Sequence, residues 1–171
     1  MVYKTTYKSP IGLLTLTSDG ENLIALYNKD IVGEEKDLPI FDKTKDWLKR
    51  YFAGKQPGVK ELPLAPEGTE FRKKVWKALC EIPYGCLVTY GDIGKQIGCK
   101  SGQAVGGAVG NNPISIIIPC HRVVGGNKSL TGYGGGLKMK VALLEHEGID
   151  TKKYAVPTKE AKLYIKSQNL C

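Results

Sequence analysis

The sequence predicts an α+β fold in two parts, a small antiparallel sheet domain over residues 1–63 and a mostly helical domain over residues 64–171. Short runs of β-branched, aromatic and aliphatic residues fill the first thirty positions. From residue 69 onward, apolar residues recur every three or four positions. A linker with three prolines at residues 54–68 lies between the two regions. A length of 171 residues suits one domain, or two small domains that share a core.

The amino-terminal part predicts a three-stranded meander followed by a helix. Residues 2–8, 13–18 and 23–28 have strand composition, and the turn sequences Ser-Pro-Ile-Gly and Asp-Gly-Glu-Asn separate them. A helix is expected over residues 40–53 and ends at Gly54, because its apolar residues share one face. These residues are Ile40, Trp47, Leu48, Tyr51 and Phe52.

The carboxy-terminal part predicts four helices, near residues 70–82, 90–97, 102–109 and 138–147. Thr69 and Ser101 are expected as N-caps of the first and third helices. The second and third helices are short and joined by a turn that contains Gly98, which is the shape of a helix-turn-helix. Residues 87–89 predict a brief strand, and residues 114–118 form an apolar, β-branched segment that ends at a proline.

Charge is distributed unevenly along the chain. The net charge of the sequence is +8. Residues 1–63 hold 10 basic and 9 acidic residues, whereas residues 64–171 hold 15 and 8. A basic domain indicates nucleic acid or another polyanion as partner, but a merely soluble basic surface explains the count equally well.

Composition excludes several classes of protein. With 42% hydrophobic and 25% charged residues, the chain is an ordinary globular protein and not a disordered, collagenous or coiled-coil one. No apolar run approaches the roughly 20 residues that span a bilayer, and no signal peptide is apparent, so we expect a cytoplasmic protein without membrane contact. The five cysteines include no Cys-x-x-Cys pair, so neither a disulfide framework nor a zinc site is expected.

The sequence Pro119-Cys120-His121-Arg122 suggests nucleophilic chemistry. A free thiol is a weak nucleophile until a base or a positive charge activates it, and His121 and Arg122 supply both types. Pro119 is expected to hold the preceding residue extended and to place Cys120 at a strand end, beside a pocket. Glu147 is a candidate to orient His121. The residue pattern alone is equally compatible with a buried structural cysteine beside a hydrogen-bonded histidine.

Several motifs together resemble one known family. Residues 118–124 are Ile-Pro-Cys-His-Arg-Val-Val, preceded by Ala-Val-Gly-Gly-Ala at 104–108 and Asn-Pro at 112–113. With Gly-Tyr at 132–133 and Glu-Gly at 147–148, this set resembles the O6-alkylguanine–DNA alkyltransferases, also called methylated-DNA–protein-cysteine methyltransferases. Residues 1–63 are only loosely similar to the ribonuclease-like domain of that family. The resemblance implies a winged-helix-like second domain.

The resemblance implies single-turnover transfer of an alkyl group from O6 of guanine to Cys120, a suicide reaction. His121 would act as base through water, with Glu147 as its carboxylate partner. Tyr90 would donate to the leaving guanine, and Asn112 would brace the turn beneath the cysteine. Residues expected to line the alkylguanine pocket or to contact substrate are Tyr133, Gly135, Lys140 and Arg122. No cofactor and no metal are expected.

The implied partner is double-stranded DNA that contains O6-alkylguanine, with the damaged base flipped out of the helix. The small-sided helix that begins at Gly102 would approach a minor groove closely through residues such as Ala104 and Gly106. Tight packing between helices would explain small residues equally well. Many family members have an arginine where this chain has Gln103, which we expect to contact the orphaned partner base. We expect the protein to be a monomer.

Other functions stay open at this point. A non-catalytic helix-turn-helix protein that binds alkyl lesions for another pathway is the main alternative, although such relatives lack the cysteine. A thiol hydrolase would turn over, and a helix-turn-helix regulator would perform no chemistry.

Overall fold

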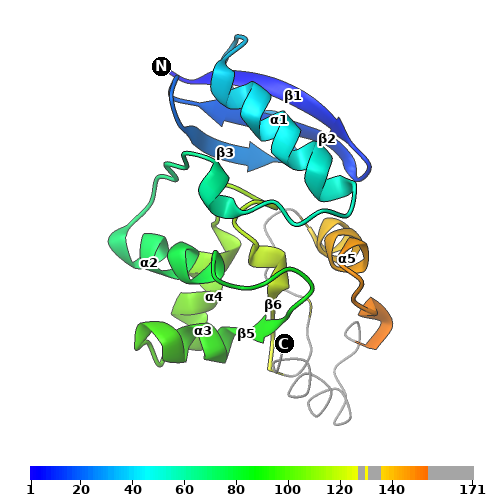
Figure 1. Cartoon of the computed structure of the whole chain (residues 1–171). Coiled ribbons are helices and arrows are strands. Elements are labelled where there is room, and N and C mark those ends of the chain that lie inside the picture. Colours follow the sequence, from blue (N-terminus) through cyan, green and yellow to red (C-terminus); the bar gives the residue numbers. More distant parts are fainter. Residues whose placement is uncertain (127–129, 131–135, 154–171) are drawn as a thin grey trace. The chain divides into compact units, whose positions relative to one another are not determined.

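The computed structural model describes residues 1–126, 130 and 136–153 (Figure 1). Two compact units divide the chain. The first comprises Met1–Glu67 and Pro113–Ile117, and the second comprises Gly68–Asn112 and the described residues from Ile118 onward. The first unit contains a small sheet and the second is mostly helical, which confirms the predicted α+β fold class. Residues 113–117, which the sequence assigned to the second part, belong to the first unit.

The first unit is a four-stranded sheet with one long helix. The strands are β1 (Tyr3–Ser9), β2 (Gly12–Ser18), β3 (Leu23–Tyr27) and β4 (Glu34–Glu35), in the spatial order β3-β2-β1-β4. The three predicted strands form the expected antiparallel meander, and β4 adds to β1 in parallel. Helix α1 (Pro39–Phe52) lies across this sheet (Figure 1). The single-turn helix η1 (Val59–Glu61) follows it.

The core of the first unit lies between α1 and the sheet. Strand β2 is central, and its residues from Leu14 to Ser18 are all buried. Helix α1 contributes the apolar face that its sequence spacing predicts, with Ile40, Phe41, Trp47, Leu48 and Tyr51 buried. Burial of these large side chains stabilises the unit, since each fully buried apolar side chain contributes about 1.5–3 kcal/mol.

Residues 113–117 form a turn in the first unit and not the extended segment that their β-branched composition predicts. The Leu26 amide donates to the Pro113 carbonyl at 2.8 Å, and the Ser115 amide donates to the Leu26 carbonyl at 3.1 Å. After this short bridge the chain reverses, and Ile116 adopts φ 72°. A left-handed conformation costs a β-branched residue about 1–2 kcal/mol, and here the buried Ile116 side chain offsets it. Tertiary contacts override strand propensity at this point.

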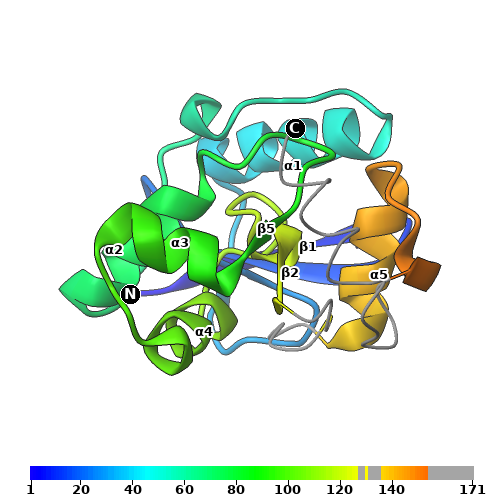
Figure 2. The same cartoon turned by 90° about the horizontal axis from the view of Figure 1, so that it is seen from below.

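The second unit contains the four predicted helices. They are α2 (Glu70–Leu79), α3 (Tyr90–Ile97), α4 (Gly102–Gly110) and α5 (Leu137–His146). Strands β5 (Val88–Thr89) and β6 (Val123–Val124) pair in parallel, and the single-turn helices η2 (Cys120–Arg122) and η3 (Thr151–Lys153) complete the unit. Figure 2 shows α2, α3 and α4 gathered together, with α5 on the other side of β5. None of the described helices has both the length and the apolar character needed to cross a membrane.

Caps fix the ends of these helices as the sequence predicts. The Thr69 hydroxyl accepts from the Arg72 amide, and the Ser101 hydroxyl accepts from the Ala104 amide. Gly98 ends α3 in the left-handed conformation with φ 72°. Helix α2 ends at Leu79, three residues before its expected end, and Ile82 is buried in the turn that follows.

One hydrogen bond anchors α4 to the rest of the helical group. The indole nitrogen of Trp76 on α2 donates to the Ala108 carbonyl at 2.8 Å, and both residues are buried. Val105, Ala108 and Val109 form the inner face of α4. The opposite face of α4 is therefore left for solvent or for a partner.

Candidate active site

Cys120 is the first residue of η2 and does not lie at a strand end. The turn at residues 113–117 takes the place of the extended segment that was expected to lead into the cysteine. The Cys120 amide donates to the Ile118 carbonyl at 2.8 Å, and the Arg122 amide donates to the Pro119 carbonyl at 3.1 Å. In a helix with three residues per turn, successive side chains point about 120° apart. Cys120, His121 and Arg122 therefore project in three directions.

Asn112 connects the end of α4 to the cysteine. Its Nδ2 donates to the Ile118 carbonyl at 2.9 Å and also lies 3.1 Å from Cys120 Sγ. The first contact braces the turn beneath the cysteine, as the resemblance implies. The second brings a donor to the sulfur, which stabilises a thiolate over a thiol.

The Cys120 thiol is enclosed by protein, with 2% of the residue exposed. Burial raises its pKa to about 11, although the Asn112 hydrogen bond and the charge of Lys140 act to lower it. At neutral pH the resting group is therefore the protonated thiol, and nucleophilic attack requires a base.

His121 is fully buried and oriented by Glu147. Its Nε2 lies 2.5 Å from Glu147 Oε2, which identifies Nε2 as the protonated nitrogen that donates to the carboxylate. Its Nδ1 is buried without a protein hydrogen-bond partner, alone in this respect among side-chain nitrogens and oxygens of the described residues. Burial lowers the pKa of His121, so the imidazole is neutral and Nδ1 presents a lone pair.

Glu147 is the C-cap of α5, yet it is buried and not solvated. Arg122 Nε donates to its Oε1 at 2.8 Å, and the Gly85 amide donates to the same oxygen at 2.9 Å. Burial by itself raises the pKa of the Glu147 carboxyl, but His121 and Arg122 outweigh burial and hold this pKa well below its usual range. The carboxylate is therefore ionised and fixed in direction.

Arg122 binds Glu147 and the loop after α2, and its expected contact with substrate stays a prediction. The residue is 8% exposed. Its guanidinium donates to Glu147 and, through Nη1, to the Ile82 carbonyl at 2.6 Å. The sequence did not predict the contact with Glu147, because a cationic residue beside a cysteine gives no sign that a carboxylate 25 positions later will bind it.

Lys140 on α5 is a buried cation close to the thiol. Its Nζ donates to the Val123 carbonyl at 2.6 Å, and the residue is 0% exposed. Burial lowers the pKa of Lys140 to about 8, while the charge of Cys120 acts in the opposite direction. Its positive charge at neutral pH favours the Cys120 thiolate.

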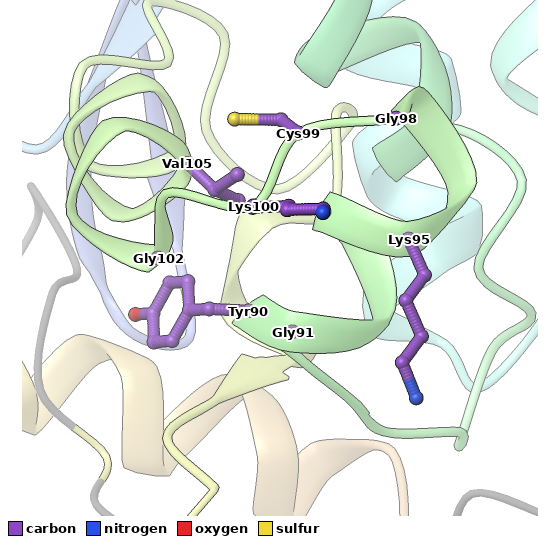
Figure 3. Close-up of a pocket in the computed structure, with 9 residues that line it drawn as sticks. Tyr90, Gly91, Lys95, Gly98, Cys99, Lys100, Gly102 and Val105 are labelled. Atoms are coloured by element: carbon purple, nitrogen blue, oxygen red, sulfur yellow. The ribbon is translucent and has the colours of Figure 1, made fainter.

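Tyr90 is the first residue of α3 and is partly buried. Burial raises the pKa of its phenol to about 12, and the charge of Cys120 adds to this effect. The phenol is therefore a hydrogen-bond donor at neutral pH. Figure 3 shows its ring extending toward Gly102 at the start of α4. Tyr90 lines a pocket of about 510 Å³ between α3 and α4, together with Gly91, Gly94, Lys95, Gly98, Cys99, Lys100, Gly102 and Val105.

The outer face of α4 is unusually free of side-chain bulk. Gly102, Gln103, Ala104 and Gly107 are exposed, and Gly106 is partly exposed. A β-carbon added at any of the three glycines would meet no atom of the described residues within 4 Å. Packing against the described residues therefore does not require these glycines, which argues against tight helix packing as the reason for small residues on this face.

Some expected residues fall elsewhere. Tyr133 and Gly135 lie outside the described residues. The described residues contain no group of three or more His, Cys, Asp or Glu side chains that could hold a metal ion.

Sequence reasoning missed the loop that supports Glu147. The Gly85 amide and the Ile82 carbonyl bind Glu147 and Arg122, and Gly85 adopts φ 77° to do so. The sequence Pro83-Tyr84-Gly85 indicated only the end of a helix. A glycine in a turn signals unusual backbone geometry, but not which buried side chain its amide will face.

Comparison with known proteins agrees with this arrangement. Residues 70–149 match the family model described as 6-O-methylguanine DNA methyltransferase, DNA binding domain. Residues 2–66 match the model described as 6-O-methylguanine DNA methyltransferase, ribonuclease-like domain. Together the two models span most of the chain.

The alignments with individual relatives extend over most of both chains. A methylated-DNA–protein-cysteine methyltransferase of Haemophilus influenzae is 46% identical over 156 residues, which are 86% of this chain and 87% of that protein. One from Methanosarcina acetivorans is 46% identical over 157 residues, 86% of this chain and 99% of that protein. The crystal structure of Mycobacterium tuberculosis OGT in complex with DNA has a TM-score of 0.77 at 42% identity and covers 94% of this chain and 99% of that one. The chain therefore belongs to the 6-O-methylguanine DNA methyltransferase family.

Proposed function

We propose that the protein repairs alkylated DNA directly, by moving the alkyl group from O6 of guanine in a duplex to its own Cys120. The observation that carries the proposal is the juxtaposition of a thiol, an amide donor and a carboxylate-oriented imidazole in a chain of this family. The chemistry makes the protein a methylated-DNA–protein-cysteine methyltransferase, and it favours this reading over a protein that only binds the lesion.

The first step is removal of the thiol proton. Glu147 holds the Nε2 proton of His121, so Nδ1 is the nitrogen available to accept a proton. We propose that a water molecule carries the proton from Cys120 Sγ to Nδ1, since the two side chains diverge on η2. Asn112 and Lys140 then stabilise the thiolate that remains.

The second step is substitution at the alkyl carbon. The thiolate sulfur forms a bond to this carbon while the bond from carbon to O6 breaks, and the electron pair of that bond stays on guanine. The phenol of Tyr90 has a pKa of about 12 and is protonated at neutral pH, so it would donate a hydrogen bond to the leaving guanine. The product is a thioether without an ionisable proton, so no step returns the cysteine. Each molecule would therefore repair one lesion.

The target base must leave the duplex before this reaction, because an enclosed thiol cannot reach the alkyl carbon while the guanine stays stacked and paired. The exposed face of α4, with Gly102, Ala104 and Gly106, suits close approach to a minor groove. Gln103 on this face would hydrogen-bond the base left without its partner. Recognition at the minor groove would suit repair that does not depend on sequence, since this groove carries a degenerate code.

We further propose a division of labour between the parts of the chain, with residues 64–171 binding DNA and transferring the alkyl group. All described residues of the site lie in the second unit. We also propose that the protein acts as a monomer. The four described cysteines are free thiols, which supports the reducing environment of the cytoplasm.

The test is single-turnover transfer from a duplex that contains one O6-methylguanine, followed by mass spectrometry of the cysteine peptides. One equivalent of methyl is expected on Cys120. Cys120→Ser should abolish transfer and retain duplex binding. Cys80→Ser is the matched control, because burial raises the pKa of the Cys80 thiol to about 11 as well, and Cys80 is not among the residues proposed for transfer. Transfer by that variant should be unchanged.

Other outcomes of the same experiment would select another function. Tight binding of the methylated duplex with Cys120 unmodified would establish the non-catalytic lesion-binding protein. Release of more than one equivalent of product per protein would establish a turning-over thiol enzyme.

A further inference from the structure

The proposed reaction leaves one buried charged group without a role. Arg122 lies between the loop after α2 and the end of α5, and its guanidinium centre lies 5.7 Å from the centre of the Tyr84 ring. Three of its nitrogens donate hydrogen bonds, to Ile82 and to both oxygens of Glu147. Both of its carboxylate contacts are to Glu147, the residue that orients His121.

The Glu147 carboxylate is held at both oxygens. Oε1 accepts from Arg122 Nε at 2.8 Å and from the Gly85 amide at 2.9 Å. Oε2 accepts from His121 Nε2 at 2.5 Å and from Arg122 Nη2 at 3.2 Å. The planar guanidinium therefore fixes the carboxylate plane, and with it the direction of the imidazole.

The electrostatic setting of Glu147 makes such an anchor necessary. Glu147 follows α5 directly, where the helix dipole disfavours an anion. Without Arg122, the cation left to pair with the buried Glu147 carboxylate would be the His121 imidazolium. That ring would hold a proton on both nitrogens, and Nδ1 would no longer be free to accept the thiol proton.

We propose that Arg122 is a positioning residue for alkyl transfer: its paired hydrogen bonds to Glu147 keep the His121 proton on Nε2 and leave Nδ1 as the acceptor for the thiol proton. The proposal rests on the proposed function, in which Nδ1 is the base. It assigns the residue after the Cys-His pair to control of the tautomer and charge of the histidine, and not to DNA.

The charges around His121 determine in which direction its pKa would change if Arg122 were lost. Glu147 favours the imidazolium, whereas Arg122 on η2 and Lys140 on α5 oppose it, and Cys120 faces the same space. Tyr84 faces the Arg122–Glu147 pair. Loss of the Arg122 charge would leave Glu147 to stabilise the imidazolium, so the pKa of His121 would rise. The base would then be protonated over more of the neutral range.

The experiment combines nitrogen NMR of His121 in the free protein with the pH dependence of single-turnover methyl transfer. Wild type is expected to show a neutral ring protonated at Nε2. In Arg122→Met the acid limb of the pH–rate profile and the His121 titration should both move up by about one pH unit. The maximal rate should fall about tenfold, as for loss of other residues that orient a reactive group. Arg122→Lys keeps the charge but not the paired donors, so its limb should stay while its rate falls.

Arg50→Met is the matched control, since Arg50 in the first unit also donates to both oxygens of a glutamate, Glu61. It should change neither readout. Unaltered His121 signals and rates in both Arg122 variants would overturn the proposal. A lower melting temperature of Arg122→Met with an unchanged pH–rate profile of the same variant would also overturn it. If Arg122→Met does not fold, Arg122→Lys decides by rate and tautomer. A wild-type protein that transfers no methyl would refute the proposed function instead, and the NMR result would then stand on its own.

Discussion

Lys140 shows how much a single buried residue costs this fold. Its side chain is enclosed, and its ammonium group is paired with a carbonyl that only partly replaces water. The fall of its pKa from 10.5 to about 8 corresponds to a folding penalty of about 3 kcal/mol. Under the proposed function, this charge stabilises the thiolate that Cys120 must form.

Lys140→Met should therefore stabilise the protein at pH 7. The folding penalty disappears, and the loss of the contacts of the ammonium group, among them the hydrogen bond to Val123, offsets only part of it. Between pH 8 and 10.5 the unfolded wild type binds a proton that the folded wild type lacks, so wild-type stability rises with pH and the gain of the variant shrinks. Urea unfolding at pH 7 and pH 10 measures both values. Exposed Lys95→Met is the control, and a gain that does not change with pH would contradict the argument.

The family resemblance implied more of the chemistry of the site than of its geometry. The resemblance indicated Cys120, His121 and Glu147, and the structure brings the last two within hydrogen-bond distance. The strand end expected for Cys120 was wrong, because β-branched composition favours strands whereas contacts with Leu26 impose a turn with Ile116 at positive φ. Such a turn depends on residues 90 positions away, which local propensity does not include.

At the scale of elements, α3 and α4 use glycine for opposite reasons. A β-carbon on Gly94 of α3 would lie 2.6 Å from the Cys99 carbonyl oxygen, so the turn between the helices needs a bare backbone there. On α4 a β-carbon on Gly107 would meet no atom of the described part of the chain within 4 Å. Glycine lowers helix stability, so its use on an open face indicates a demand from outside the protein.

Alanine at these two glycines should consequently have opposite effects on stability. Gly107→Ala should raise the free energy of unfolding by about 0.5–1 kcal/mol through helix propensity, and it should weaken duplex binding because a methyl group now separates α4 from DNA. Gly94→Ala should lower the free energy of unfolding. Thermal unfolding and a duplex titration give the two readouts. Unchanged DNA affinity in Gly107→Ala would argue that α4 does not approach DNA closely.

Helix positions were the most predictable part of the fold. Residues 90–97 form α3 as expected, and Ser101 caps α4 with its own hydroxyl. Caps and glycine stops are local signals, so one sequence reveals them. The support of Glu147 by Gly85 and Arg122 joins three separate segments and carries no local signal.

For the whole molecule, charge and architecture divide in the same way along the chain. Residues 64–171 carry a net charge of +7 out of +8, and the site lies in the unit built mainly from them. Attraction between this part and the phosphates of DNA would not depend on the lesion. The affinity for undamaged duplex should therefore come largely from released counterions.

Duplex binding should weaken steeply with salt. Neutralisation of about four phosphates predicts a loss of roughly a hundredfold in affinity between 50 and 200 mM salt. Fluorescence anisotropy with labelled duplex, with and without O6-methylguanine, measures the slope. The two slopes should be equal, because the flipped base adds no phosphate contact. A duplex affinity that does not change with salt would show that the basic residues at positions 64–171 do not contribute to binding.

The enclosure of Cys120 has a further consequence for a protein that is consumed by its own reaction. With 2% of the residue exposed and a pKa near 11, the resting sulfur is both hidden and unreactive toward peroxide or stray electrophiles. Under the proposed function, activation of the sulfur depends on His121, which is buried as well. The unreacted protein can therefore persist for long periods before it meets a lesion.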